Sequence, residues 1–327
     1  MRSLPIVLSI AVQLFFYSCS SNQKTQEQQN SDVKSPTNTT PDFNADSAFQ
    51  FVKTQVEFGP RVPNTAAHRS CSDFLFNKLK SYTPNVVDQR GQVTAFDGTK
   101  LEIRNLIASF NPQNKGRILL FAHWDSRPWA DQDTVRTHDP IDAADDGASG
   151  VATLLEMARQ FSIKSPSVGV DIAFFDAEDW GDKGGGNDDS YALGTQFWAR
   201  QPHVADYHAL YGVLLDMTGA KNARFRLEGN SYENAGTYME NIWRTAASLG
   251  YSDYFVFEPG GYVTDDHVYV IKYGIPSVDI INSDKTTRSG FAPHWHTHAD
   301  NLEIIDPHTL KAVGQTLLEV IYKGGVN

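Results

Sequence analysis

An alternation of two hydrophobic patterns constrains the fold of this chain more than any other feature. Short apolar runs rich in β-branched and aromatic residues, such as residues 117–121 and 168–175, are typical of buried strands. Segments with helical periodicity separate these runs. The alternation indicates a mainly parallel sheet with helices on both faces. We therefore predict an α/β fold: a single three-layer α/β/α domain with a mixed, mainly parallel central sheet.

The same two patterns predict the order of the elements. Helices are expected over residues 46–58, 65–82, 147–161, 191–200, 232–249 and 306–323, and strands over residues 105–110, 117–121, 168–175, 210–217, 254–257 and 276–281. In open α/β sheets ligands bind beyond the carboxyl ends of the strands, so polar residues at those ends are the candidates for function.

The N-terminus has the pattern of an export signal. After Met1-Arg2-Ser3, residues 4–17 are apolar, too short a run to span a bilayer but suited to the core of a signal peptide. The run ends in Phe-Tyr-Ser-Cys19, which resembles a bacterial lipobox. We predict a signal peptide over residues 1–19, lipidation of Cys19 and a periplasmic or cell-envelope lipoprotein of a bacterium. Plain secretion and an uncleaved anchor are the alternatives.

The remaining chain divides into a tether and a domain. Residues 20–41 are rich in Ser, Asn, Gln and Thr, which predicts a flexible polar tether, and residues 42–327 form the expected catalytic domain. With 28 Lys and Arg against 39 Asp and Glu, the net charge is −11, and no long basic cluster occurs, so no nucleic-acid partner is expected. We expect a monomer, in which Cys71 is a buried structural thiol.

Ionisable residues follow three of the predicted strands. His123 and Asp125 end one strand, Glu178 and Asp179 end a second, and Asp216 ends a third. A helix cap or a solvated turn would explain any one of them. Three neighbouring parallel strands, however, converge at one edge of the sheet. The sequence therefore predicts one site at that edge.

The residue types at this edge favour a metal ion. Asp145-Asp146 precedes a predicted helix, where one carboxylate can cap the helix while its neighbour reaches a cation. Extended backbone at Glu178-Asp179 would send the two side chains to opposite sides, so that one can bind metal while the other faces substrate. His296 supplies the nitrogen that zinc prefers in a mixed site with an open position. His294 and His298 are weaker ligand candidates.

Two other kinds of chemistry lack support. The glycine-containing stretch at residues 181–189 has no Lys-Ser/Thr pair before a helix, which argues against phosphate binding and for a flexible loop near the site. No Gly-x-Ser-x-Gly elbow occurs, and the sequence around Cys71 has no nucleophile signature.

The assembled motifs resemble the zinc-exopeptidase superfamily and, within it, the glutaminyl-peptide cyclotransferases of bacterial and animal type. The motifs are AHWDSR at residues 122–127, ADDGASG at 144–150, FFDAED at 174–179, LDM at 215–217, TDDH at 264–267 and WHT at 295–297. The resemblance runs from about residue 46 to the C-terminus. It implies a zinc-aminopeptidase-like fold.

Two branches of the superfamily remain open on the metal ligands alone. In the two-zinc aminopeptidases the ligands match His123, Asp146, Asp179, Asp216 and His296, and all five residue types are present. In the cyclases the resemblance implies one zinc on Asp146, Asp179 and His296, while the Asp216 position joins a hydrogen-bond network with Asp265.

The neighbours of the metal ligands favour the cyclases. Trp295, Phe291 and Thr264 resemble the cyclase pocket that binds substrate, and Asp179 in place of the Glu of animal enzymes matches the bacterial form. Glu178, Asp216 and Asp265 are the implied catalytic residues. The resemblance predicts conversion of N-terminal glutamine in peptides and proteins to pyroglutamate with release of ammonia, with Glu178 as base and then acid. The alternatives are a two-zinc aminopeptidase and a catalytically inactive, lipid-anchored binding protein.

Overall fold

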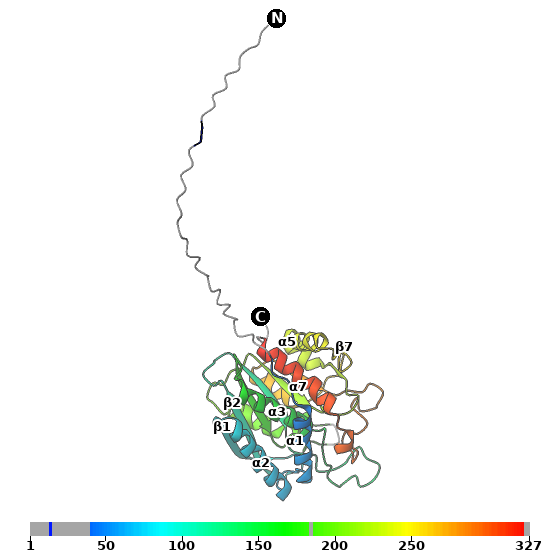
Figure 1. Ribbon diagram of the computed structural model, residues 1–327. Helices are drawn as coiled ribbons and strands as arrows, with labels where there is room; N and C mark the ends of the chain where they lie inside the picture. Colours follow the sequence, from blue (N-terminus) through cyan, green and yellow to red (C-terminus); the bar gives the residue numbers. More distant parts are fainter. Residues whose placement is uncertain (1–12, 15–39, 183–185, 324–327) are drawn as a thin grey trace. The chain divides into compact units, whose positions relative to one another are not determined.

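The computed structural model describes residues 13–14, 40–182 and 186–323 (Figure 1). The predicted signal peptide, Cys19 and nearly all of the predicted tether lie outside the described residues. Within the described part of the chain, no helix has the length and apolar character needed to cross a bilayer.

A six-stranded sheet forms the centre of the domain, with strand order β1-β2-β4-β3-β5-β8. The four strands from β4 to β8 pair in parallel, whereas β1 and β2 add an antiparallel edge. The sheet is therefore mixed and mainly parallel, as predicted. Its strands are β1 Val86–Thr94, β2 Lys100–Phe110, β3 Arg117–His123, β4 Gly169–Phe175, β5 Tyr211–Asp216 and β8 Ser277–Ile281, and a separate parallel pair is formed by β6 Phe225–Leu227 and β7 Phe255–Pro259.

Helices cover both faces of the sheet, which confirms the predicted three layers. They are α1 Ala45–Glu57, α2 Ala66–Tyr82, α3 Ala148–Ile163, α4 Leu193–Arg200, α5 Gly229–Ser248, α6 Asp266–Tyr273 and α7 Pro307–Tyr322. Figure 1 shows α1, α3 and α7 side by side on one face. Along β3, Leu120 belongs to the core beneath these helices, whereas Leu119 and Phe121 pack with Trp198 of α4 on the other face.

Local sequence signals explain where several helices begin. The side chains of Asn44, Thr65 and Asp306 accept hydrogen bonds from backbone N–H groups in the first turns of α1, α2 and α7. Pro307 occupies the first turn of α7, where its missing N–H costs nothing. These three helices lie within a residue or two of their predicted bounds.

Two strands and one α-helix among the described residues were not predicted. β1 is an edge strand whose residues are mostly half-buried or exposed, so its sequence lacks a strong apolar pattern. β6 has three residues and α6 has eight, too few for periodicity to be decisive. Cys71 is buried and free, and burial raises the pKa of its thiol to about 12, which agrees with a structural role.

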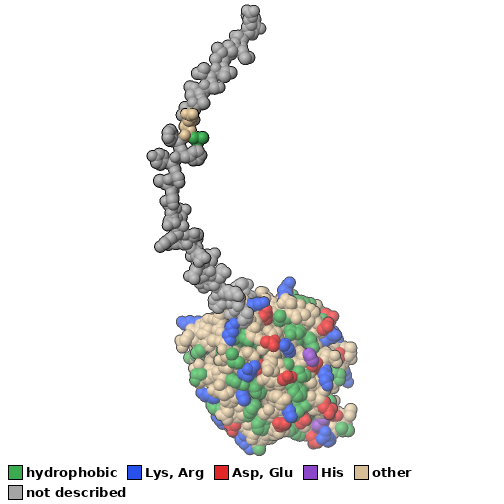
Figure 2. Space-filling model, in the orientation of Figure 1, with side chains coloured by type: hydrophobic (Ala, Val, Ile, Leu, Met, Phe, Trp, Pro, Cys, Tyr) green, Lys and Arg blue, Asp and Glu red, His purple; other side chains and the backbone are tan. Residues whose placement is uncertain are grey.

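Acidic and basic side chains are interspersed on the surface drawn in Figure 2. Lys and Arg do not gather into one broad basic area on that face.

Candidate active site

All nine residues predicted from the sequence for the site line one cavity of about 330 Å³. The cavity lies beyond the carboxyl ends of β3, β4, β5 and β8, where the sheet order places such a site. The predicted residues are Asp146, Glu178, Asp179, Asp216, Thr264, Asp265, Phe291, Trp295 and His296. Six further residues complete the lining: Asp188, Tyr191, Met217, Tyr262, Val263 and Ile281.

Asp146, Asp179 and His296 form a group that can hold a metal ion. Their ligand atoms all lie within 4.8 Å of one another, and the three side chains are buried. The His296 Nε2 atom is 3.3 Å from Asp179 Oδ1 and 3.6 Å from Asp146 Oδ2. Asp179 Oδ2 is buried without a hydrogen-bond partner. Because a buried carboxylate oxygen without a partner is costly, this donor set fits a divalent cation such as zinc.

Asp131 and Arg127 hold two of these side chains in place. The Asp131 Oδ1 atom lies 3.4 Å from His296 Nδ1, so Nε2 is left for the cavity. The buried Arg127 donates to Asp179 Oδ1 at 2.9 Å and to Asp131 at 2.6 Å. Burial alone would raise the pKa of Asp131, but hydrogen bonds from His296 and Arg127 outweigh it and lower that pKa. Sequence reasoning assigned no role to either residue.

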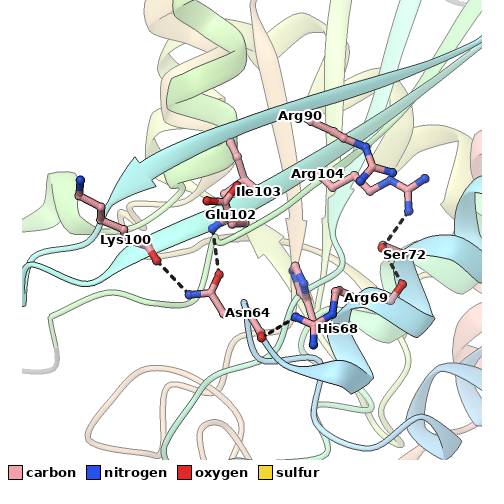
Figure 3. A pocket seen from close by; sticks show the side chains of 9 residues that line it. All are labelled: Asn64, His68, Arg69, Ser72, Arg90, Lys100, Glu102, Ile103 and Arg104. Carbon is pink, nitrogen blue, oxygen red and sulfur yellow. Dashed lines mark hydrogen bonds between the residues drawn. The ribbon is translucent and has the colours of Figure 1, made fainter.

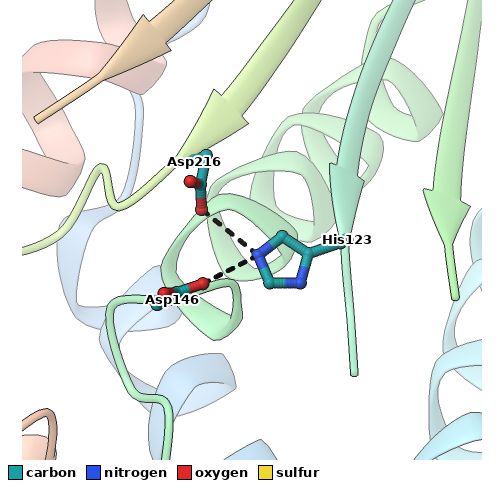
Figure 4. A group of neighbouring side chains, drawn as sticks. All are labelled: His123, Asp146 and Asp216. Atoms are coloured by element: carbon teal, nitrogen blue, oxygen red, sulfur yellow. Dashed lines mark hydrogen bonds and ion pairs between the residues drawn. The ribbon is translucent and has the colours of Figure 1, made fainter. Parts of the chain in front are cut away.

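A second possible metal group shares Asp146 with the first (Figure 4). In it, His123 Nε2 is 3.0 Å from Asp146 Oδ1 and 3.2 Å from Asp216 Oδ1. Burial alone would lower the pKa of His123, but hydrogen bonds to Asp125, Asp146 and Asp216 raise it well above its usual value. An imidazolium can therefore bridge the two carboxylates. The structure thus assembles all five residue types of a two-metal site.

A turn after β4 places Glu178 and Asp179 in the same cavity. Ala177 has a φ of 52°, a left-handed conformation that is uncommon for residues other than glycine. The N–H groups of Glu178 and Asp179 donate to the Asp125 carboxylate at 3.0 and 3.2 Å, which fixes the turn. Both side chains line the cavity, with Asp179 in the metal group and Glu178 outside it. Burial, followed by the nearby Asp265, raises the pKa of Glu178 well above its usual value.

The prediction that Asp145 or Asp146 caps α3 is wrong. Gly147 is the N-cap residue, and no side chain caps the helix. Asp145 instead accepts hydrogen bonds from the Gly219 N–H at 2.7 Å and from His294 Nε2 at 3.0 Å. A Cβ atom at Gly147 would lie 2.5 Å from the His123 carbonyl oxygen. Glycine is therefore required where this segment passes β3.

The two weaker histidine candidates bind carboxylates outside the metal groups. His294 contacts Asp145, and His298 Nδ1 lies 2.9 Å from Asp133 Oδ2. Neither residue belongs to a metal group found among the described residues.

Aromatic side chains form the wall of the cavity next to His296. The ring centroids of Phe291 and Trp295 are 4.5 Å apart, and Trp295 stacks on His296 at 3.7 Å. On the other side, burial and the neighbouring carboxylates raise the pKa values of Asp216 and Asp265 to about 7 each. These two groups can therefore carry a proton near neutral pH.

A separate cavity of about 490 Å³ lies between α2 and β2 (Figure 3). Several basic side chains line it, but acidic partners neutralise two of them: Arg104 binds Asp73 and Asp88, and Arg90 binds Asp88. The metal groups found among the described residues include none of its lining residues.

Comparison with known proteins agrees with this geometry. The model of peptidase family M28 matches residues 105–321, which is more than half of the chain. The chain belongs to this family. Its structure is similar to a Zn-dependent exopeptidase from Parabacteroides distasonis, with 56% identity, a TM-score of 0.85 and coverage of 87% of this chain and 99% of that one.

Glutaminyl cyclases are among the similar proteins. The structure of the glutaminyl cyclase of Bacteroides thetaiotaomicron, bound to N-acetylhistamine, matches at 48% identity with a TM-score of 0.84 and covers 87% of this chain and 99% of that chain. The glutaminyl-peptide cyclotransferase of Bos taurus is 29% identical over 247 residues, which are 65% of this chain and 64% of the bovine protein. The chain thus spans about two thirds of the bovine relative's length.

Proposed function

We propose that this M28 protein is a zinc-dependent glutaminyl-peptide cyclotransferase. It converts the N-terminal glutamine of peptides and proteins to pyroglutamate and releases ammonia. The observation that carries the proposal is one buried cavity in which Asp146, Asp179 and His296 lie beside Glu178 and the aromatic wall of Trp295. The similarity to solved glutaminyl cyclases supports it.

Asp146, Asp179 and His296 would hold a single zinc ion. When bound, the zinc acts as a Lewis acid that polarises the side-chain carbonyl of the substrate glutamine. The resemblance of the site motifs to the single-zinc cyclases supports a count of one, whereas a second metal would bind at the group of His123, Asp146 and Asp216. Metal analysis of the purified chain tests this count: one zinc per chain supports it, and two contradict it.

Glu178 performs both proton transfers in the proposed reaction. The α-amino nitrogen attacks the side-chain amide carbon, so a C–N bond forms and the amine must lose a proton. Glu178 accepts that proton and returns it to the amide nitrogen, which leaves as ammonia when the second C–N bond breaks. The raised pKa of Glu178 makes its carboxylate a stronger base, which favours acceptance of the amine proton in the first step.

The remaining residues orient the substrate and exclude water. Asp216 and Asp265 would share a proton and hydrogen-bond the leaving amide nitrogen. Trp295 and Phe291 would pack against the methylenes of the glutamine side chain and keep water from competing as nucleophile. Thr264 lines the same cavity and would bind substrate beside Asp265.

An aminopeptidase is the rival function. Its support is the second group of His123, Asp146 and Asp216, which completes a two-metal set, together with the membership in a peptidase family. Incubation with a Gln-peptide separates the two: a cyclase releases ammonia and blocks the N-terminus, and an aminopeptidase frees glutamine. A catalytically inactive binding protein would do neither.

We also propose that the chain is exported and anchored to the cell envelope of a bacterium through lipidated Cys19. The apolar run at residues 4–17 and the lipobox-like end support this proposal. Labelling of expressing cells with a radioactive fatty acid should mark the wild-type chain and not Cys19→Ala. Equal labelling of both would contradict it.

A further inference from the structure

A second group of buried titratable side chains lies behind Asp265. Its members come from three elements: Glu228 precedes α5, His267 is in α6 and Asp279 is in β8. Their residues are 2%, 0% and 0% exposed, so none of them reaches substrate or bulk solvent. The proposed reaction gives them no role.

His267 lies between Glu228 and Asp279 and contacts both. Its Nε2 atom is 3.1 Å from Glu228 Oε2, and its Nδ1 atom is 3.6 Å from Asp279 Oδ2. Ligand-type atoms of Asp265, His267 and Asp279 all lie within 4.8 Å of one another. The imidazole therefore lies between Glu228 on one side and the carboxyl groups of Asp279 and Asp265 on the other.

Glu228 fixes which nitrogen of His267 carries a hydrogen. Backbone N–H groups of Asn230, Ser231 and Val263 donate to its carboxylate at 2.7 to 3.0 Å. Burial alone would raise the pKa of Glu228, but the hydrogen bonds from His267 and Ser231 lower it to about 2. A carboxylate that stays ionised can only accept hydrogen bonds. Nε2 of His267 must therefore donate, and Nδ1 faces Asp279.

The opposite side of His267 lacks hydrogen-bond partners. Nδ1 and both carboxyl oxygens of Asp279 are buried without one, and each such group costs roughly 1–3 kcal/mol if it stays unsatisfied. With Nε2 donating to Glu228, Nδ1 is an acceptor, so a protonated Asp279 can donate to it while the other Asp279 oxygen accepts from a protonated Asp265. Burial raises the pKa of Asp279 well above its usual value, which makes the protonated carboxyl available. The titratable groups outside this set that act on Asp265 or Asp279 are His123, Asp216 and Asp266.

We propose that His267 is a positioning residue for the cyclisation: Glu228 holds its ring, and through Asp279 it orients Asp265 toward the leaving nitrogen of the substrate. The inference rests on the proposed cyclase function. A purely structural role explains the group less well, because a buried carboxylate–imidazole pair contributes little net stability after both groups are desolvated. Orientation of a reacting group is a benefit that such a pair can provide.

The test uses the full zinc-loaded chain and two substitutions at one position. His267→Phe removes both nitrogens at nearly constant shape, whereas the amide of His267→Asn can donate or accept at the Nδ1 position. We expect His267→Phe to lower kcat by about 10²-fold, with KM within about twofold because substrate binding is kept. His267→Asn should recover a large part of the lost kcat. Zinc content should equal that of the wild type in both.

A matched control is His203→Asn. His203 packs against the rings of Trp198 and Tyr207 and accepts a hydrogen bond from Trp198 Nε1 at 3.1 Å, outside the catalytic cavity. Its kcat should equal that of the wild type. If His267→Phe does not fold, Asp279→Leu takes its place, since Leu can neither donate to Nδ1 nor accept from Asp265, and it should show the same loss of kcat.

Three results would overturn the role of His267. The first is a kcat for His267→Phe within about twofold of the wild type. The second is a decrease in the activity of the sample that is fully explained by the fraction of His267→Phe that fails to fold. The third is a loss of one metal equivalent from His267→Phe, which would make Asp265, His267 and Asp279 a metal site instead. Absence of ammonia release by the wild-type chain is a different result, because it overturns the proposed function itself.

Discussion

Glu178→Gln separates catalysis from folding in this protein. The substitution keeps the shape of the side chain but removes the group that is proposed to take and return a proton. General acid–base catalysis contributes about 10²- to 10⁴-fold, so kcat should fall by that factor, which is roughly 3–5.5 kcal/mol of activation free energy. The zinc ligands are unchanged, so zinc content should be that of the wild type.

The same variant should be at least as stable as the wild type when zinc is removed. Burial and Asp265 raise the pKa of Glu178 in the folded state. A raised carboxyl pKa means that folding opposes ionisation, so this group contributes stability below its unfolded pKa and loses that contribution as pH rises through its folded pKa. A neutral amide removes this loss. The melting temperature of zinc-free Glu178→Gln should therefore exceed that of the zinc-free wild type, increasingly as pH rises to neutrality.

Ammonia release from a Gln-peptide and thermal unfolding are the two assays. Glu240→Gln is the matched control, because Glu240 lies on α5, is not among the residues that line the cavity, and pairs with Arg244 at 2.8 Å. It should keep the wild-type kcat. Retention of more than about a tenth of the wild-type kcat by Glu178→Gln would refute its acid–base role. A lower melting temperature would refute the argument from burial.

Three further substitutions and treatments test other parts of the account. Trp295→Ala should raise KM and lower kcat/KM for Gln-peptides, measured by steady-state kinetics, because the wall beside His296 is lost. Arg127→Met leaves Asp179 and Asp131 without their buried partner, so it should lower the free energy of unfolding by about 3–5 kcal/mol in denaturant titrations. Cys71, with its pKa raised to about 12, should resist a thiol reagent at neutral pH until the chain is unfolded, and fast labelling of the native chain would contradict its burial.

The positions of the residues at the strand ends could be predicted because parallel strands of one sheet end at the same edge. Runs such as that of β4 are fully buried, and their neighbours pair in parallel, so the residues after them must share one edge of the sheet. This reasoning brings Glu178, Asp179 and Asp216 together without knowledge of any loop. His296 and Trp295 lie on a loop: the preference of zinc for a nitrogen ligand pointed to His296, whereas only the motif resemblance indicated Trp295.

The supporting contacts could not be predicted in the same way. Asp131 reaches His296 across 165 residues of sequence, and Asp300 accepts from the N–H of Asp145 across 155 residues. Such pairs depend on loop conformations that no periodicity encodes. The prediction of a side-chain cap on α3 is wrong for a related reason. The carboxylate of Asp145 accepts hydrogen bonds from the Gly219 N–H and from His294 instead of from the first turn of its own helix.

Mass spectrometry of a Gln-peptide after incubation with the zinc-loaded chain tests the central claim most directly. The account predicts a product that has lost the mass of ammonia from its first residue, with equimolar ammonia in solution and no free amino acid. A peptide shortened by its first residue, with free glutamine, would contradict the account and establish the aminopeptidase instead.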